Sequence, residues 1–145
     1  MKPGLATLAV TLMLATSAFA ATPKPMSLDK SSSFLIDSAT AEQVWKENTP
    51  ARVSKLYPMR KFRFVSEVTG GFTDNKTCVV SARAMLLPVV LHPVQGTKVV
   101  YSPIKSASAF DAQPSLDEAQ CRDLAKGKLK EAIHSIMSTL AADAS

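Results

Sequence analysis

Two histidines, His92 and His134, are the side chains of this 145-residue chain best suited to acid–base chemistry near neutral pH. Nucleophilic catalysis needs such a base within hydrogen-bond reach of a nucleophile, and a third group that orients the base. His92 stands between Leu91 and Pro93, and no signature such as G-x-S-x-G places a nucleophile beside either histidine. We therefore expect no catalytic residue. A small enzyme that uses His92 is the alternative.

Metal and cofactor chemistry has as little support in the sequence. Two isolated histidines and two cysteines do not make the clustered ligand set of a zinc site. Asp74-Asn75 lacks the further acidic positions of a calcium loop, and no glycine-rich phosphate loop occurs. We expect neither a metal ion nor a cofactor.

The two cysteines, Cys78 and Cys121, predict a disulfide if the chain is exported. They are too far apart in sequence for the C-x-x-C spacing of a redox pair, so the bond would be structural. Two buried free thiols are the alternative.

The N-terminus has the pattern of a signal peptide. Residues 1–3 form a short positive region, residues 5–16 are mostly apolar, and Ala18-Phe19-Ala20 is an A-x-A cleavage site. A membrane anchor would need about 20 apolar residues, and this stretch is shorter. We expect cleavage after Ala20, no membrane span, and a periplasmic or secreted protein.

The net charge of the whole chain is +5. Cleavage after Ala20 would remove Lys2 and so one positive charge. A mild excess of this kind is compatible with an acidic protein partner or an anionic envelope polymer. The basic residues are not interleaved with aromatic ones as in a nucleic-acid surface, so we expect no nucleic acid.

Residues 21–33 are rich in proline, serine and lysine and predict a disordered lead-in to a single domain over residues 34–145. Thr40 and Gln43 fit a capping box that opens a short helix. Thr49 followed by Pro50 predicts a second short helix that ends at Pro58.

Alternation of polar and apolar residues then predicts strands. The period is two from Arg60 to Val68 and again over residues 77–87, with turn residues between them, as in an antiparallel hairpin. A third strand over residues 98–105 would extend this pair into a meander. Pro103 cannot donate to a neighbouring strand, which favours an edge position.

The last element predicted is an amphipathic helix of about 25 residues. Ser115 and Glu118 fit a capping box, and apolar residues recur every three to four positions from Cys121 to Leu140. Cys78 falls on the same strand face as the small residue Ala82, so a disulfide would tie the helix across the sheet. The predicted fold is α+β: a three-stranded antiparallel meander packed against a long C-terminal helix, with short N-terminal helices and one disulfide.

Two features are candidates for binding. Arg122, Lys126, Lys130 and His134 recur every four residues along the last helix. They are either a solvated face, with Glu118 pairing to Arg122, or a docking ridge for an acidic partner.

The second candidate is the apolar run MLLPVVLHPVQG at residues 85–96. Its part beyond Pro88 is interpreted as a loop over residues 88–94 that either covers the core or stands exposed to a partner. The predicted partner-binding residues are Val89, Val90, Leu91, His92, Arg122, Lys126 and Lys130.

The features above favour a protein that acts by binding. Our first hypothesis is an exported periplasmic protein-binding module, most concretely an inhibitor or immunity protein that blocks an envelope-acting enzyme or toxin. The alternative is an accessory structural subunit of an envelope or secretion assembly, held by strand addition at the predicted edge or by the apolar loop.

Overall fold

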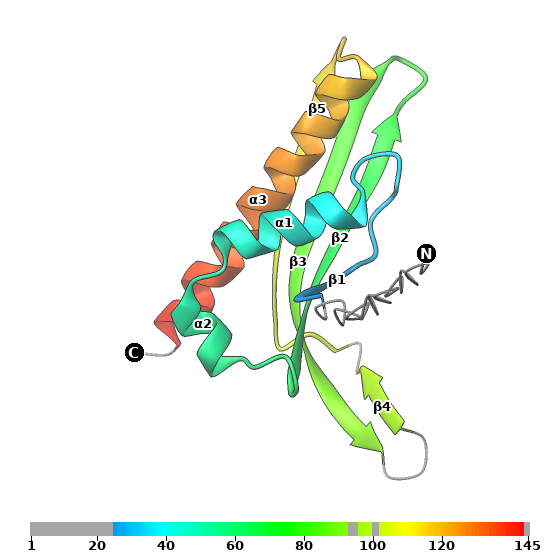
Figure 1. Ribbon diagram of the computed structural model, residues 1–145. Helices are drawn as coiled ribbons and strands as arrows, with labels where there is room; N and C mark the ends of the chain where they lie inside the picture. The colour runs from blue at the N-terminus through cyan, green and yellow to red at the C-terminus, as the bar shows by residue number, and fades with distance from the viewer. Residues whose placement is uncertain (1–24, 93–95, 100–101, 144–145) are drawn as a thin grey trace, which may run out of the picture.

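The computed structural model describes residues 25–92, 96–99 and 102–143, and for residues 90–92 and 96–99 it describes the backbone alone. Figure 1 shows strands in one layer with helices lying across them, which confirms the α+β class. The predicted signal peptide and its cleavage site lie outside the described residues. Along the chain the elements are β1 (Ser27–Asp29), α1 (Ser38–Asn48), α2 (Ala51–Leu56), β2 (Phe62–Phe72), β3 (Thr77–His92), β4 (Gly96–Val99), β5 (Lys105–Pro114) and α3 (Glu118–Ala142).

The main sheet is mixed. β2 and β3 form the predicted antiparallel hairpin, with Phe72 opposite Cys78 next to the turn. β5 pairs antiparallel with the other side of β3, and β1 pairs parallel with β2, which sets the order β1-β2-β3-β5. β4 pairs with the end of β3 that lies beyond this sheet. The predicted three-stranded antiparallel meander is therefore wrong in the number of strands and in being purely antiparallel, because the added strand β1 runs parallel to β2.

Two separate strands take the place of the predicted third strand over residues 98–105. β4 ends at Val99 and β5 begins at Lys105, so Pro103 lies between strands and not in an edge strand. β5 reads KSASAFDAQP, and the residues that it turns toward the core include Ala107 and Ala109. These side chains are too small to produce the clear hydrophobic alternation that marks a strand in a sequence.

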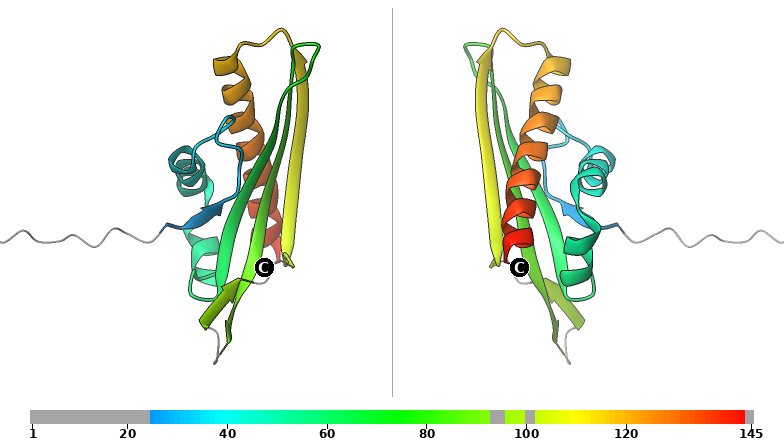
Figure 2. Two further views of the ribbon diagram at one scale, coloured as in Figure 1. Left: turned by 90° about the vertical axis from the view of Figure 1, so that its right-hand side faces the viewer. Right: turned by 90° about the vertical axis from the view of Figure 1, so that its left-hand side faces the viewer.

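The helices cover one face of the sheet, as the two views in Figure 2 show. α3 packs on β3 and β5, and α1 packs on α3. The small Ala82 and Ala84 of β3 are fully buried beneath α3, where they leave room for its larger side chains. The buried residues that α3 contributes are Cys121, Ala125, Leu129, Ala132, Ile133, Ile136, Met137 and Leu140. None of the helices in the described parts of the chain is long and apolar enough to cross a membrane.

The predicted disulfide between Cys78 and Cys121 is confirmed. It joins the second residue of β3 to the first turns of α3, with the two Cα atoms 5.8 Å apart. Both cysteines are fully buried. In the chain-entropy model a bond that closes this loop stabilises the fold by about 4 kcal/mol. It also supports an oxidising, extracytoplasmic location, because structural disulfides persist mainly there.

The predicted disordered lead-in over residues 21–33 is wrong for the part that the structure describes. Residues 27–29 form β1, and the carboxylate of Glu42 accepts hydrogen bonds from the backbone N–H groups of Met26 and Ser27 at 2.7 and 2.9 Å. Leu35, just after the predicted lead-in, is fully buried in the core. Composition alone does not predict that this segment is ordered, because its structure depends on pairing with β2 and on hydrogen bonds to Glu42.

The helix caps also differ from those predicted. Asp37, not Thr40, caps α1, and its carboxylate accepts from the backbone N–H of Thr40 at 2.8 Å. Asp117, not Ser115, caps α3 and forms a capping box with Gln120. In both places the aspartate has the extended backbone that an N-cap requires, whereas Ser115 has a positive φ of 64°.

Candidate functional site

The seven predicted partner-binding residues lie in two separate regions. Residues 89–92 are at the far end of β3, whereas Arg122, Lys126 and Lys130 follow one another along α3. In Figure 1 the start of α3 and the far end of β3 lie at opposite ends of the molecule. The structure therefore does not bring the seven residues into one site.

The end of β3 forms a two-stranded arm, which we define as Val89–His92 paired with Gly96–Val99. Within the main sheet the last pairs of β3 are Phe62 with Pro88 and Lys105 with Leu86. Beyond them β3 has lost both neighbours and pairs with β4 alone, and the arm extends away from the sheet and helices (Figure 1).

The predicted loop over residues 88–94 is wrong for residues 88–92, whose backbone belongs to β3; residues 93 and 94 lie outside the described residues. β3 continues through Pro88, which has no N–H to donate, and the next N–H, of Val89, donates to the carbonyl of Lys61 at 2.7 Å. The backbone of residues 89–92 runs outward and does not fold back over the core. The side chains of Val90, Leu91 and His92, together with Pro93, lie outside the described residues, so their role in binding stays a prediction.

Arg122 connects α3 to an exposed pair of aromatic rings. Its guanidinium forms an ion pair with Glu118 at 2.6 Å, one helical turn earlier, which is the pairing predicted for a solvated face. The same guanidinium lies 5.7 Å from the ring centre of Phe34. Phe34 in turn packs edge-on against Phe72, with ring centres 6.2 Å apart. Sequence reasoning missed this aromatic pair because Phe34 and Phe72 are far apart in the chain.

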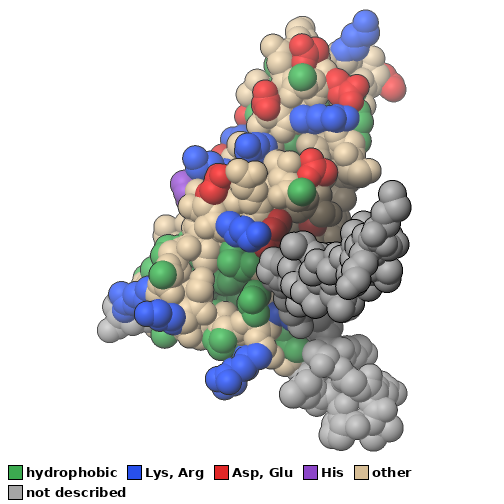
Figure 3. All heavy atoms as spheres, viewed as in Figure 1, with side chains coloured by type: hydrophobic (Ala, Val, Ile, Leu, Met, Phe, Trp, Pro, Cys, Tyr) green, Lys and Arg blue, Asp and Glu red, His purple; other side chains and the backbone are tan. Residues whose placement is uncertain are grey.

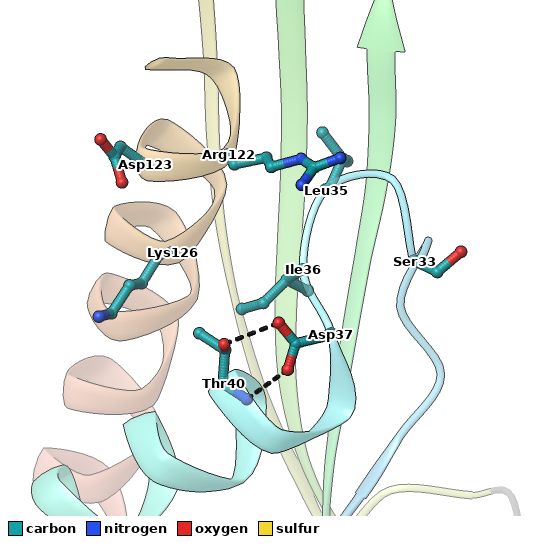
Figure 4. Close-up of a pocket in the computed structure, with 8 residues that line it drawn as sticks. All are labelled: Ser33, Leu35, Ile36, Asp37, Thr40, Arg122, Asp123 and Lys126. Atoms are coloured by element: carbon teal, nitrogen blue, oxygen red, sulfur yellow. Dashed lines mark hydrogen bonds between the residues drawn. The ribbon is translucent and has the colours of Figure 1, made fainter. Parts of the chain in front are cut away.

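A cleft of about 320 Å³ opens beside Arg122, between α3 and the segment before α1 (Figure 4). Arg122 points toward Leu35, while Asp123 and Lys126 point to the other side. Asp37 and Thr40 bond to each other at the start of α1. These bonds, above all the one from the Thr40 N–H, lower the pKa of the Asp37 carboxyl. Basic and acidic groups both line the cleft, so it does not select one sign of charge.

Lys130 and His134, the C-terminal residues of the predicted ridge on α3, lie outside this cleft. Lys130 is exposed and does not line the cleft, whereas the Nε2 atom of His134 lies 2.7 Å from Oδ1 of Asn48 in α1. A second cleft of about 560 Å³ lies here. Ser138 donates its hydroxyl to the backbone carbonyl of His134 and not to the ring, so these two residues are not arranged as a nucleophile and its base.

Within the described residues no three histidine, cysteine or acidic side chains come together in a way that could hold a metal ion. Comparison with known protein-family models finds no match for this chain. A search of curated proteins likewise finds no relative with significant similarity.

Proposed function

We propose that this chain is an exported protein-binding module, most concretely an inhibitor or immunity protein that blocks an envelope-acting enzyme or toxin. The observation that carries this proposal is the arm. β3 runs past the ends of both β2 and β5, so the sequence VVLH leaves the main sheet on a two-stranded ribbon. A projecting ribbon of this shape can enter a cleft of a partner, and its sequence contains the apolar residues Val90 and Leu91, a residue type found in the apolar patches of interaction sites.

The disulfide supports the exported part of the proposal. A buried bond between β3 and α3 is expected where thiols are oxidised, as in a periplasm or outside the cell. It also holds the main sheet and α3 together at the end opposite the arm, so the arm extends from a stable base.

The experiment is a capture from a periplasmic extract with the immobilised protein as bait. Val90→Asp combined with Leu91→Asp is expected to abolish capture of the partner while the melting temperature stays that of the wild type. Phe110→Asp is the matched control, because Phe110 is 65% exposed on β5, outside the arm. Capture that survives the arm substitutions, or that is lost equally in the control, contradicts binding through the arm.

A second candidate function is an accessory structural subunit held by strand addition. β5 is ten residues long, and in the described residues it pairs on one side alone, with β3. A free edge of this length can accept a strand from another protein. Gene deletion separates the two candidates: loss of a structural subunit should disturb assembly at once, whereas loss of an inhibitor should be harmless until its target is present.

A further inference from the structure

One stretch of the chain concentrates positive charge beside exposed apolar side chains. Between Asn48 and Ser66 the sequence contains no acidic residue. We define the basic patch by four cations of this region: Lys55, Arg60, Lys61 and Arg63. They lie on α2, on the turn that follows it and at the start of β2.

Two apolar side chains beside the cations of the basic patch are exposed, because another residue of α2 is the one buried in the core. Val53 is fully buried and fixes α2 to the core, which leaves Leu56 46% exposed and Met59 39% exposed. Tyr57 packs edge-on against Phe62, with ring centres 5.3 Å apart. Beside these residues is an apolar hollow of about 240 Å³, lined by Met26, Ser54, Tyr57, Pro58, Met59 and Phe64.

In the described parts of the chain, the four cations of the basic patch form no ion pair with an acid. In Figure 3 the lower part of the described surface, over α2, shows apolar side chains flanked by basic ones and no acidic side chain. The nearby acids have other partners: Glu42 pairs with Lys46 at 3.5 Å, and Asp143 pairs with Lys105 at 2.8 Å. The basic patch therefore presents a net positive surface.

Cations interleaved with the exposed Leu56 and Met59 side chains suit a membrane surface better than a soluble acidic protein. Lysine and arginine reach the anionic headgroups, while the apolar side chains enter the boundary with the acyl chains. The basic patch also adjoins the base of the arm, since the carbonyl of Lys61 accepts from the N–H of Val89 at 2.7 Å. A protein bound to a bilayer through this patch would hold its arm close to the membrane surface.

We propose that the basic patch docks this protein reversibly on bilayers that contain anionic phospholipid. This goes beyond the proposed function and does not depend on what the arm binds. Each lysine or arginine near an anionic surface strengthens partitioning by about fivefold, so neutralising two of them should weaken it about 25-fold. Attraction of this kind is screened by salt.

The test is co-sedimentation of the exported, purified protein with vesicles of phosphatidylcholine, with and without phosphatidylglycerol. Lys55→Gln combined with Lys61→Gln should reduce binding to the anionic vesicles about 25-fold. Lys126→Gln combined with Lys130→Gln is the matched control, because it removes the same charge from α3 and should leave binding close to that of the wild type. Leu56→Ser should weaken binding further, whereas Phe110→Ser should not.

Three outcomes of the vesicle experiment overturn the proposal: no binding of the wild type to anionic vesicles, equal binding to neutral vesicles at every salt concentration, or equal loss in the two lysine pairs. Binding to soluble polyglutamate in place of vesicles would assign the basic patch to an acidic polymer and also overturns it. Failure here leaves the proposed function intact, because loss of partner capture is measured with Val90→Asp and Leu91→Asp, and these residues lie outside the basic patch.

Discussion

The carboxylate of Glu42 holds Ser27 by two hydrogen bonds, one from its backbone N–H at 2.9 Å and one from its hydroxyl at 2.6 Å. Ser27 is buried, and it is the first residue of β1. One acid on α1 therefore fixes the strand that begins the described fold. Burial disfavours ionisation of Glu42, but the hydrogen bonds from Ser27 and Met26 outweigh this and lower the pKa of its carboxyl.

Glu42→Gln is expected to destabilise the fold by about 1–3 kcal/mol, because it leaves a donor of the β1 segment without its charged acceptor. The pKa of Glu42 is lowered on folding from its usual 4.5, so this contribution is present above pH 4.5 and is lost as the pH falls through the folded pKa. Chemical denaturation at a series of pH values measures both effects. If the variant loses stability on acidification as steeply as the wild type, Glu42 does not have this role.

Replacing Cys78 and Cys121 together by alanine is expected to lower the stability by about 4 kcal/mol, because the unfolded chain regains the freedom of the closed loop. The melting temperature should fall by more than about 10 °C. Thermal unfolding of the variant, with the wild type as reference, measures the change. A reducing agent should lower the melting temperature of the wild type and leave that of the variant unchanged; equal responses would contradict a structural bond.

The sequence predicts elements that carry their own periodic signal. β2, the first part of β3 and α3 alternate or recur clearly, and the positions of Cys78 and Cys121 on their faces predict how the helix lies on the sheet. β1 and β5 were missed for a shared reason. β1 is three residues long and β5 is made largely of serine and alanine, so their pairing depends on neighbours that are distant in sequence.

Contacts between residues that are distant in sequence also limited the prediction of the candidate site. Proline at position 88 suggested that the strand ends there, because proline removes a ladder donor. The strand continues because the next N–H, of Val89, finds the Lys61 carbonyl at the end of the main sheet and β4 takes over the pairing. The contact of Arg122 with Phe34 could not be derived from spacing, since the two residues are far apart in the chain.

Replacing Gly70 and Gly127 by alanine should change the stability of the protein in opposite directions. At Gly70 the φ angle is +130°, and an added Cβ would lie 2.0 Å from the carbonyl oxygen of Val79, so Gly70→Ala should cost about 3 kcal/mol or more. Gly127 is exposed on α3 with open space around it, so Gly127→Ala should stabilise the protein by about 0.5–1 kcal/mol. Denaturant midpoints compare the two variants. Loss of stability in Gly127→Ala would mean that the backbone there is not regular helix.

The free edge of β5 has donors that point away from β3. The N–H of Ala112 donates to its neighbour Asp111 at 2.8 Å, which shows that it faces outward. Because N–H groups alternate in direction along a strand, those of Phe110 and Ser108 face outward as well. Ser108→Pro therefore removes a donor from the free edge without removing one from the β3 pairing.

If β5 accepts a strand from an assembly partner, Ser108→Pro should abolish incorporation into that assembly while the melting temperature changes little. Ser108→Ala is the matched control, since it keeps the N–H and should assemble normally. Fractionation of the envelope complex from cells that carry each variant measures incorporation. Normal incorporation of Ser108→Pro would rule out strand addition at this edge, and loss in both variants would assign the effect to the serine side chain instead of the backbone. Normal incorporation of Ser108→Pro would favour the arm as the binding element, because the arm reaches a partner without using the edge of β5.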